Sequence, residues 1–166
     1  MTLGSHQRAI GRSQVHLTPR WIIDALGPFD LDPCAADPRP WDCAHRNLTV
    51  ADDGLAHQWI GRVWLNPPFD RREVARWIER LARHGDGIAL LHARTETAWF
   101  RPVWARADAI LFLDRRLHFC RPDGTEQPAN SGAPPALIAF GAANYGALRR
   151  AKISGNLVMR WEAQAP

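Results

Sequence analysis

The 166-residue sequence lacks any apolar run of the roughly 20 residues that a membrane-spanning helix needs. Its first 14 residues include basic side chains but no apolar stretch typical of a signal peptide. It also lacks internal repeats and low-complexity tracts. From these absences we expect a cytoplasmic protein with no membrane partner.

Cysteine is scarce, because the chain has only Cys34, Cys43 and Cys120 and no CxxC motif. In a cytoplasmic protein we expect no disulfide bonds. A zinc site could be assembled from these cysteines with His45 and His118. However, the spacing matches no standard zinc module, so ordinary core or surface positions are the favoured interpretation. We therefore expect no metal.

Lysine is almost missing, since Lys152 is the only one among 21 Lys and Arg residues. The formal net charge is +4. The planar guanidinium of arginine suits phosphates and base edges, which is typical of nucleic-acid-binding proteins. A codon bias toward arginine would explain the same composition. The charge therefore permits a nucleic-acid partner without proving one.

The remaining composition is that of a soluble globular protein, with 46% hydrophobic and 23% charged residues. A chain of this length makes one domain of ordinary size. We expect a flexible arm over residues 1–15 and a single domain over residues 16–166.

Segments that are apolar along their whole length alternate with segments of helical periodicity. This alternation predicts an α/β sandwich with a mostly parallel central sheet. The first helix is expected to have Thr18 as its N-cap and Pro19 at its first helical position. A helix near residues 95–107 should be bent or interrupted at Pro102. The expected strands are 29–33, 62–65, 88–93, 109–114 and 136–141, with a short one at 47–50, and the clearest helix is 71–84.

Polar residues follow three of the expected strands, where α/β proteins bind their ligands. Asp32-Pro33 ends the first, and Asn66-Pro67-Pro68-Phe69 ends the second. The third ends in the residues 92–95 (His-Ala-Arg-Thr). Residues 34–61 are too long and irregular to be a simple turn, which indicates a function for them as well.

The Asn66–Phe69 segment has the chemistry to hold an amino group. The Asn66 side chain and the Pro67 backbone each offer a carbonyl acceptor, and the prolines fix their direction. Two acceptors on one amine would draw its nitrogen toward a tetrahedral nucleophile, while Phe69 could stack on the attached ring. A plain proline turn with a core phenylalanine is the alternative interpretation.

The segment "NPPF" resembles the [DNS]PP[YFW] motif of methyltransferases that modify amino groups with S-adenosylmethionine. The ordered series "TPRWIIDAL", "FDLDPCAA", "RVWLNPPF", "ARTETAWF", "RRLHF" and "PPALIAFG" resembles the phage-type DNA N6-adenine methyltransferase family from about residue 16 to 141. The resemblance implies a compact Rossmann-like methyltransferase sandwich, whose sheet could be trimmed or permuted. It also implies methyl transfer to adenine N6 in DNA, with S-adenosylhomocysteine as the product and no metal.

The resemblance also implies roles for individual residues. Asp32 would accept a hydrogen bond from the cofactor's ammonium group, although it could simply cap a turn. Asp52 or Asp53 would bind the cofactor's adenosine part, although a surface turn explains both equally well. The implied catalytic residues are Asn66, Pro67, Pro68 and Phe69. The implied cofactor-binding residues are Thr18, Pro19, Asp32, Pro33, Cys34, Asp53 and Asn66.

Arg94, Arg115 and Arg116 lie at or just beyond strand ends and are candidates for contacts with DNA. Solvated surface arginines are the alternative, most of all for Arg115. Trp99 and Phe100 are expected in the core rather than on a base. The chain has no room for a separate target-recognition domain. The DNA sequence would then be read by residues 34–61, the loop 115–135, the N-terminal arm or a second subunit in a homodimer.

Other functions stay open from the sequence alone. The same tetrapeptide serves methylation of cytosine N4, of RNA adenine and of a protein glutamine. A catalytically silent DNA-binding protein could retain the fold, although an intact Asn66–Phe69 motif argues against it. An unrelated phosphate-binding enzyme is disfavoured because no GxGxxG or GxxxxGK[ST] loop occurs.

Overall fold

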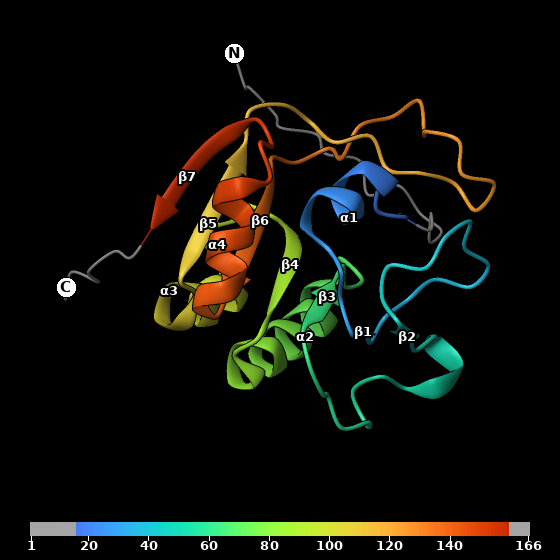
Figure 1. Cartoon of the computed structure of the whole chain (residues 1–166), viewed down its shortest axis with the longest axis horizontal. Helices are drawn as coiled ribbons and strands as arrows, with labels where there is room; N and C mark the ends of the chain where they lie inside the picture. Colours follow the sequence, from blue (N-terminus) through green and yellow to red (C-terminus); the bar gives the residue numbers. More distant parts are fainter. Residues whose placement is uncertain (1–15, 160–166) are drawn as a thin grey trace, which may run out of the picture.

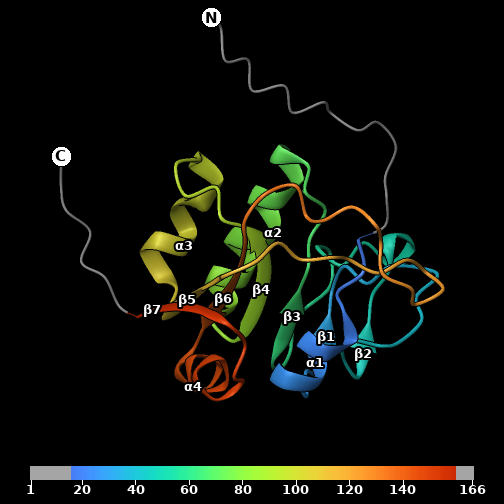
Figure 2. The ribbon, with the colours of Figure 1, turned by 90° about the horizontal axis from the view of Figure 1, so that it is seen from above.

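A seven-stranded sheet forms the centre of the protein, with helices on both of its faces (Figures 1 and 2). The computed structural model describes residues 16–159, and the expected arm over residues 1–15 lies outside them. The strands are β1 (Leu31–Asp32), β2 (Arg46–Asn47), β3 (Val63–Leu65), β4 (Gly87–His92), β5 (Ala109–Leu113), β6 (Pro135–Phe140) and β7 (Gly155–Met159).

The strand order is β2-β1-β3-β4-β6-β5-β7. Strands β2, β1, β3 and β4 are parallel to one another. Strand β6 is antiparallel to both β4 and β5, and β7 is antiparallel to β5. Since β5 therefore runs in the direction of β4, most strands share one direction. The mixed α/β architecture with a mostly parallel sheet, which the sequence predicts, is confirmed.

Within residues 16–159, four α-helices and two 3-10 helices accompany the sheet. Helices α2 and α3 cover one face, and α1 and α4 cover the other (Figure 2). The helices are α1 (Arg20–Leu26), η1 (Val50–Asp52), α2 (Arg71–His84), η2 (Ala98–Phe100), α3 (Arg101–Arg106) and α4 (Ala142–Arg150).

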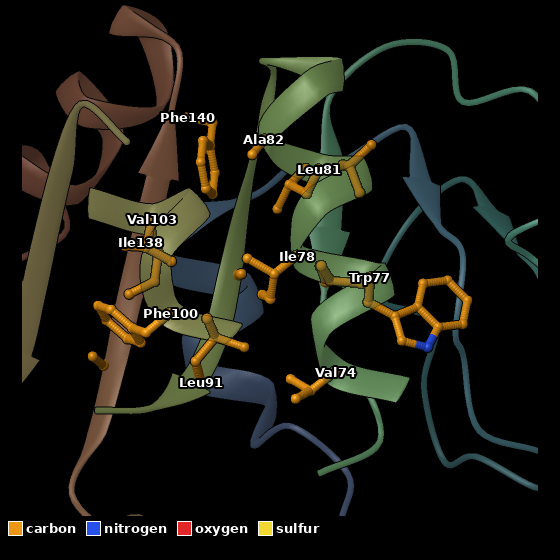
Figure 3. Packing of buried hydrophobic residues seen from close by; sticks show 14 of the residues in the cluster. Val74, Trp77, Ile78, Leu81, Ala82, Leu91, Phe100, Val103, Ile138 and Phe140 are labelled. Atoms are coloured by element: carbon orange, nitrogen blue, oxygen red, sulfur yellow. The ribbon is translucent and has the colours of Figure 1, made fainter. Parts of the chain in front are cut away.

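Helix α2 follows directly from its sequence. The Asp70 side chain accepts hydrogen bonds from the backbone N–H groups of Arg72 and Glu73 and so caps the N-terminus. Gly85, with φ of 77°, ends the helix in the left-handed conformation that glycine adopts without strain. Apolar residues at helical spacing face the sheet, including Val74, Ile78 and Leu81 (Figure 3).

The two faces of the sheet have separate cores. The first is built around α2 and α3 and includes Phe100, which is fully buried as the sequence predicts (Figure 3). Trp99 is half-buried against the same cluster. The second core lies between the sheet and helices α1 and α4 and includes Phe29 and Trp64. Both cores hold the strand ends in fixed positions.

Three local predictions are wrong by small margins. The N-cap of α1 is Pro19, not Thr18 as predicted. The Thr18 hydroxyl accepts a hydrogen bond from Asn66 Nδ2. Pro102 does not interrupt a helix, because it lies in the first turn of α3, where its missing N–H is no loss. The predicted strand at 47–50 is shifted to Arg46–Asn47, and η1 follows it.

Candidate active site

A cavity of about 750 Å³ lies where the strand ends of β1, β3 and β4 meet residues 16–18 and the loop 127–132. This volume is within the range of small-molecule and cofactor sites. The cavity brings together most of the residues that the sequence singles out. They are Thr18, Asp32, Cys34, Asn66, Pro67, Pro68 and Phe69.

Asn66 is held by residues about 50 positions earlier in the chain. Its Nδ2 donates to the His16 backbone oxygen at 2.8 Å and to Thr18 Oγ1 at 3.2 Å. A backbone carbonyl only accepts hydrogen bonds, so the His16 oxygen fixes which end of the amide is the NH2 group. The side-chain oxygen of Asn66 must therefore point away from His16.

That oxygen is the notable feature of the site. Asn66 Oδ1 is buried and has no hydrogen-bond partner among the described residues. A buried acceptor without a partner costs about 1–3 kcal/mol, so such groups need an explanation. The residue lines the cavity. A ligand with an N–H donor would satisfy the oxygen.

Asp32 is the buried carboxylate of the cavity, with 5% of its surface exposed. Burial raises its pKa to about 7, although the Cys34 N–H and the nearby Arg39 pull it in the opposite direction. The Cys34 N–H donates to Asp32 Oδ1 at 3.1 Å. This bond supports the alternative that Asp32 caps its turn, but it leaves the second carboxylate oxygen for other contacts. A cationic ligand would stabilise the charged form of Asp32.

Cys34 connects the two strand-end motifs. Its thiol donates to the Asn66 backbone oxygen at 3.3 Å. Burial raises the pKa of Cys34 and of Cys43, and the nearby Asp32 adds to the shift. Both thiols therefore stay protonated and act as small packing groups instead of nucleophiles.

An aromatic group surrounds Phe69. Its ring stacks on His92 with centroids 4.1 Å apart and lies 6.0 Å from the rings of Phe119 and His16. Burial, with smaller effects from Arg94, His16 and Arg116, lowers the pKa of His92 to about 4. The imidazole is therefore neutral near pH 7. One face of Phe69 is thus already covered.

The two predicted cofactor-binding prolines lie outside the lining of the cavity. Pro19 and Pro33 are both buried but do not line the cavity. Each instead directs the chain next to a lining residue, Thr18 and Asp32 respectively. Their expected contact with a cofactor stays a prediction.

The Asp52-Asp53-Gly54 turn packs next to Pro33 but does not line the cavity. Asp52 closes a capping box, since its carboxylate accepts from the N–H and hydroxyl of Thr49. Asp53 is exposed, has a left-handed φ of 49° and does not line the cavity. Gly54, however, packs directly on the Pro33 carbonyl, where even a Cβ atom would clash. The turn is therefore fixed beside the Asp32-Pro33 motif.

The three predicted DNA-contacting arginines do not line this cavity. Arg94 is exposed and lies close enough to His92 to lower its pKa. Arg115 makes an exposed ion pair with Asp114 at 3.3 Å. Arg115 and Arg116 line a second cavity instead.

Several lining residues are absent from the sequence-based selection. Except for His92, they come from segments with no regular pattern, so only the tertiary structure brings them to the strand ends. The backbone of His16 positions Asn66, and Arg39 contributes positive charge near Asp32. Others are Trp41, Cys43, His92, Phe119, Gln127, Asn130 and Ser131. His92 is part of the strand end 92–95 that the sequence indicates, but the sequence assigns it no role.

Residues 16–159 contain no cluster of three or more His, Cys, Asp or Glu side chains that could hold a metal ion. The cysteines and histidines of the alternative zinc site do not form such a cluster. In the same range no helix has the length and apolarity to cross a bilayer.

Fold and site together define an α/β protein whose strand ends present an Asn-Pro-Pro-Phe motif beside a buried carboxylate. The model of the family described as DNA N-6-adenine-methyltransferase (Dam) matches residues 9–153. The chain belongs to this family, which confirms the resemblance found in the sequence. No curated protein and no solved structure matches the chain.

Proposed function

We propose that this protein transfers a methyl group from S-adenosylmethionine to the N6 amino group of adenine in DNA. The single observation that carries the proposal is the buried, unpartnered Asn66 Oδ1 in the same cavity as Asp32. Family membership supports the substrate, because the family is named for DNA adenine N6 methylation. We expect it to act in the cytoplasm of a bacterial host or a phage-infected cell.

Asn66 would hold the target amine. Its Oδ1 accepts one N–H, and its orientation is fixed in advance by His16 and Thr18. The Pro67 carbonyl is the second acceptor, and its direction is restricted because the next residue is Pro68. Accepting both hydrogens makes the nitrogen more tetrahedral and directs its lone pair. The same two oxygens stabilise the positive charge that develops there.

Phe69 would hold the base. Because His92 covers one face of its ring, the adenine stacks on the other face. The base reaches the cavity by leaving the DNA helix, as in other enzymes that act on duplex bases. The methylated amine is acidic and loses its proton to water, so the site needs no strong base. Positioning provides most of the catalysis.

The cavity also has a donor set that fits the cofactor. When bound, S-adenosylmethionine supplies a methyl group on a positively charged sulfur. Asp32 would accept from the ammonium group of its methionine part, and the buried carboxylate would be kept ionised by that charge. Thr18, Pro19, Pro33 and Cys34 would shape that end of the site. Asp53 would contact the adenosine part.

The test is to incubate the protein with methyl-labelled S-adenosylmethionine and separate DNA, RNA and protein acceptors. Digestion of the labelled DNA to nucleosides should give N6-methyldeoxyadenosine. Label found only in RNA, in protein or in N4-methyldeoxycytidine would overturn the proposal. An Asn66→Ala variant should transfer no methyl group, and it should still bind S-adenosylhomocysteine because Asp32 is unchanged.

A further inference from the structure

A second cavity of about 480 Å³ lies against the first one. It is formed by the exposed side of α1, the segment after β5 and the turn before β7. We propose that it binds the DNA strand next to the target base, with a phosphate at Arg116 and Lys152 and a flanking base on Trp21. This inference rests on the proposed function and extends it to a separate site. The lining residues with charged or aromatic side chains are Trp21, Asp114, Arg115, Arg116, His118, Glu126 and Lys152.

The two cavities share a wall in which neighbouring residues face opposite sides. Phe119 lines the first cavity, whereas the adjacent Leu117 and His118 line the second. Gln127 lines the first cavity, and the adjacent Glu126 lines the second. His118 Nδ1 lies 3.0 Å from the Gln127 backbone oxygen. A strand whose base enters the first cavity would therefore continue directly into the second.

The charges that line the cavity favour a single phosphate. Arg115 is paired with Asp114, which also accepts a hydrogen bond from Ser154. Arg116 is exposed, and its charge has a small part in lowering the pKa of His92 in the first cavity. Lys152 is held at the cavity in a left-handed conformation with φ of 52°. Glu126 disfavours a second anion, so one phosphate between Arg116 and Lys152 is the best match.

Trp21 offers the flat surface that a flanking base needs. It lies on α1, whose buried side is made by Ile22, Ile23 and Leu26, and 47% of its surface is exposed. An exposed tryptophan contributes little to a core, but its ring can stack on any base. Stacking of this kind is worth about 1–3 kcal/mol per base.

The experiment measures DNA binding without a methyl donor, so that no turnover is needed. Trp21→Ala and the double variant Arg116→Gln/Lys152→Gln are compared with the wild-type protein. The control is Arg101→Gln/Arg106→Gln, which removes the same charge from exposed positions on α3, on the opposite face of the sheet. Affinity is measured over a range of salt concentrations, and thermal melting confirms that each variant is folded.

Trp21→Ala should weaken DNA binding roughly 5- to 150-fold. Arg116→Gln/Lys152→Gln should lower the slope of log affinity against log salt by about 1, as expected for one phosphate, whereas the α3 control should not. Affinity for S-adenosylhomocysteine should be unchanged in every variant. DNA affinity and slope equal to those of the α3 control would overturn this inference while leaving the proposed reaction intact. Absence of methyl transfer to DNA adenine would instead overturn the reaction itself.

Discussion

Phe69 and His92 form a face-to-face pair, with ring centroids 4.1 Å apart and ring planes 11° apart. The two residues end neighbouring parts of the sheet, since Phe69 follows β3 and His92 is the last residue of β4. His92 Nε2 is buried and has no hydrogen-bond partner among residues 16–159. The imidazole contacts Phe69 through its ring face, and we therefore expect His92 to position Phe69.

Replacing His92 with alanine should loosen Phe69 and lower kcat/KM on DNA about 2- to 10-fold, the range expected for loss of one aromatic pair. His92→Phe should restore most of the activity because it restores the stack. Affinity for S-adenosylhomocysteine should stay unchanged in both variants. Equal activity of the alanine and phenylalanine variants would show that the stack does not position Phe69.

The buried carboxylate of Asp32 should make cofactor binding depend on pH. Its pKa of about 7 means that the charged form, which binds an ammonium group, is lost as the pH falls below 7. Affinity for S-adenosylhomocysteine, measured by calorimetry from pH 5.5 to 8.5, should rise with pH and level off above about 8. Asp32→Asn should bind weakly at every pH and show no such rise.

The same pKa predicts a gain of stability in the Asp32→Asn variant. Folding raises the pKa of this carboxyl group, so its contribution to the free energy of unfolding is largest below its unfolded pKa near 3.8. This contribution is lost as the pH rises through about 7 and the buried group becomes charged. At pH 8 the free energy of unfolding of the variant should exceed that of the wild-type protein by up to about 4 kcal/mol. At pH 4 the two proteins should differ little. Urea unfolding at both pH values checks the sign.

Thr18 should matter to catalysis through Asn66. Thr18→Val removes the hydroxyl that accepts from Asn66 Nδ2 but leaves the bond to the His16 backbone. Since one hydrogen bond is worth about 1 kcal/mol, kcat should fall about 5-fold. Thr18→Ser should retain most of the wild-type rate. A valine variant with wild-type kcat would mean that the His16 backbone alone orients the amide.

Gly54 should be intolerant of a side chain. A Cβ atom there would lie 1.7 Å from the Pro33 backbone oxygen, so Gly54→Ala must displace the turn from the end of β1. We expect a lower melting temperature and weaker cofactor binding. Gly146→Ala in α4 is the matched control, because its Cβ would meet only the flexible end of Arg150. That variant should melt at the wild-type temperature or slightly above it.

Arg62 should be important for stability but not for chemistry. Its guanidinium donates to the backbone oxygens of Leu26 and Pro28 and to Asn144 Oδ1, and it lies 4.3 Å from the centroid of the Phe29 ring. Arg62→Ala should lower the free energy of unfolding by about 2–4 kcal/mol. Any fraction that stays folded should methylate DNA at the wild-type rate. Single-turnover assays below the melting temperature would measure this rate.

The sequence by itself determined the elements and the chemistry of the strand ends. Helix α2 could be predicted because its apolar spacing, its Asp70 cap and its Gly85 stop are local signals. The strands β3, β4, β5 and β6 could be predicted because each is a continuous apolar run. The Asn66–Phe69 motif could be interpreted because its two carbonyl acceptors lie next to each other in the chain. The burial of Phe100 was also predicted, whereas Trp99 is only half-buried.

Only the tertiary structure decided which distant residues meet. The capping role of Thr18 was predicted from local propensity, but a contact with Asn66, 48 positions away, uses its hydroxyl instead. The antiparallel direction of β6 follows from its pairing with both β4 and β5, which no apolar run encodes. The stacking of His92 on Phe69, and the second cavity around Trp21, likewise depend on how separate segments pack. Local sequence fixes dihedral preferences and burial, whereas long-range contacts depend on the packing of the whole chain.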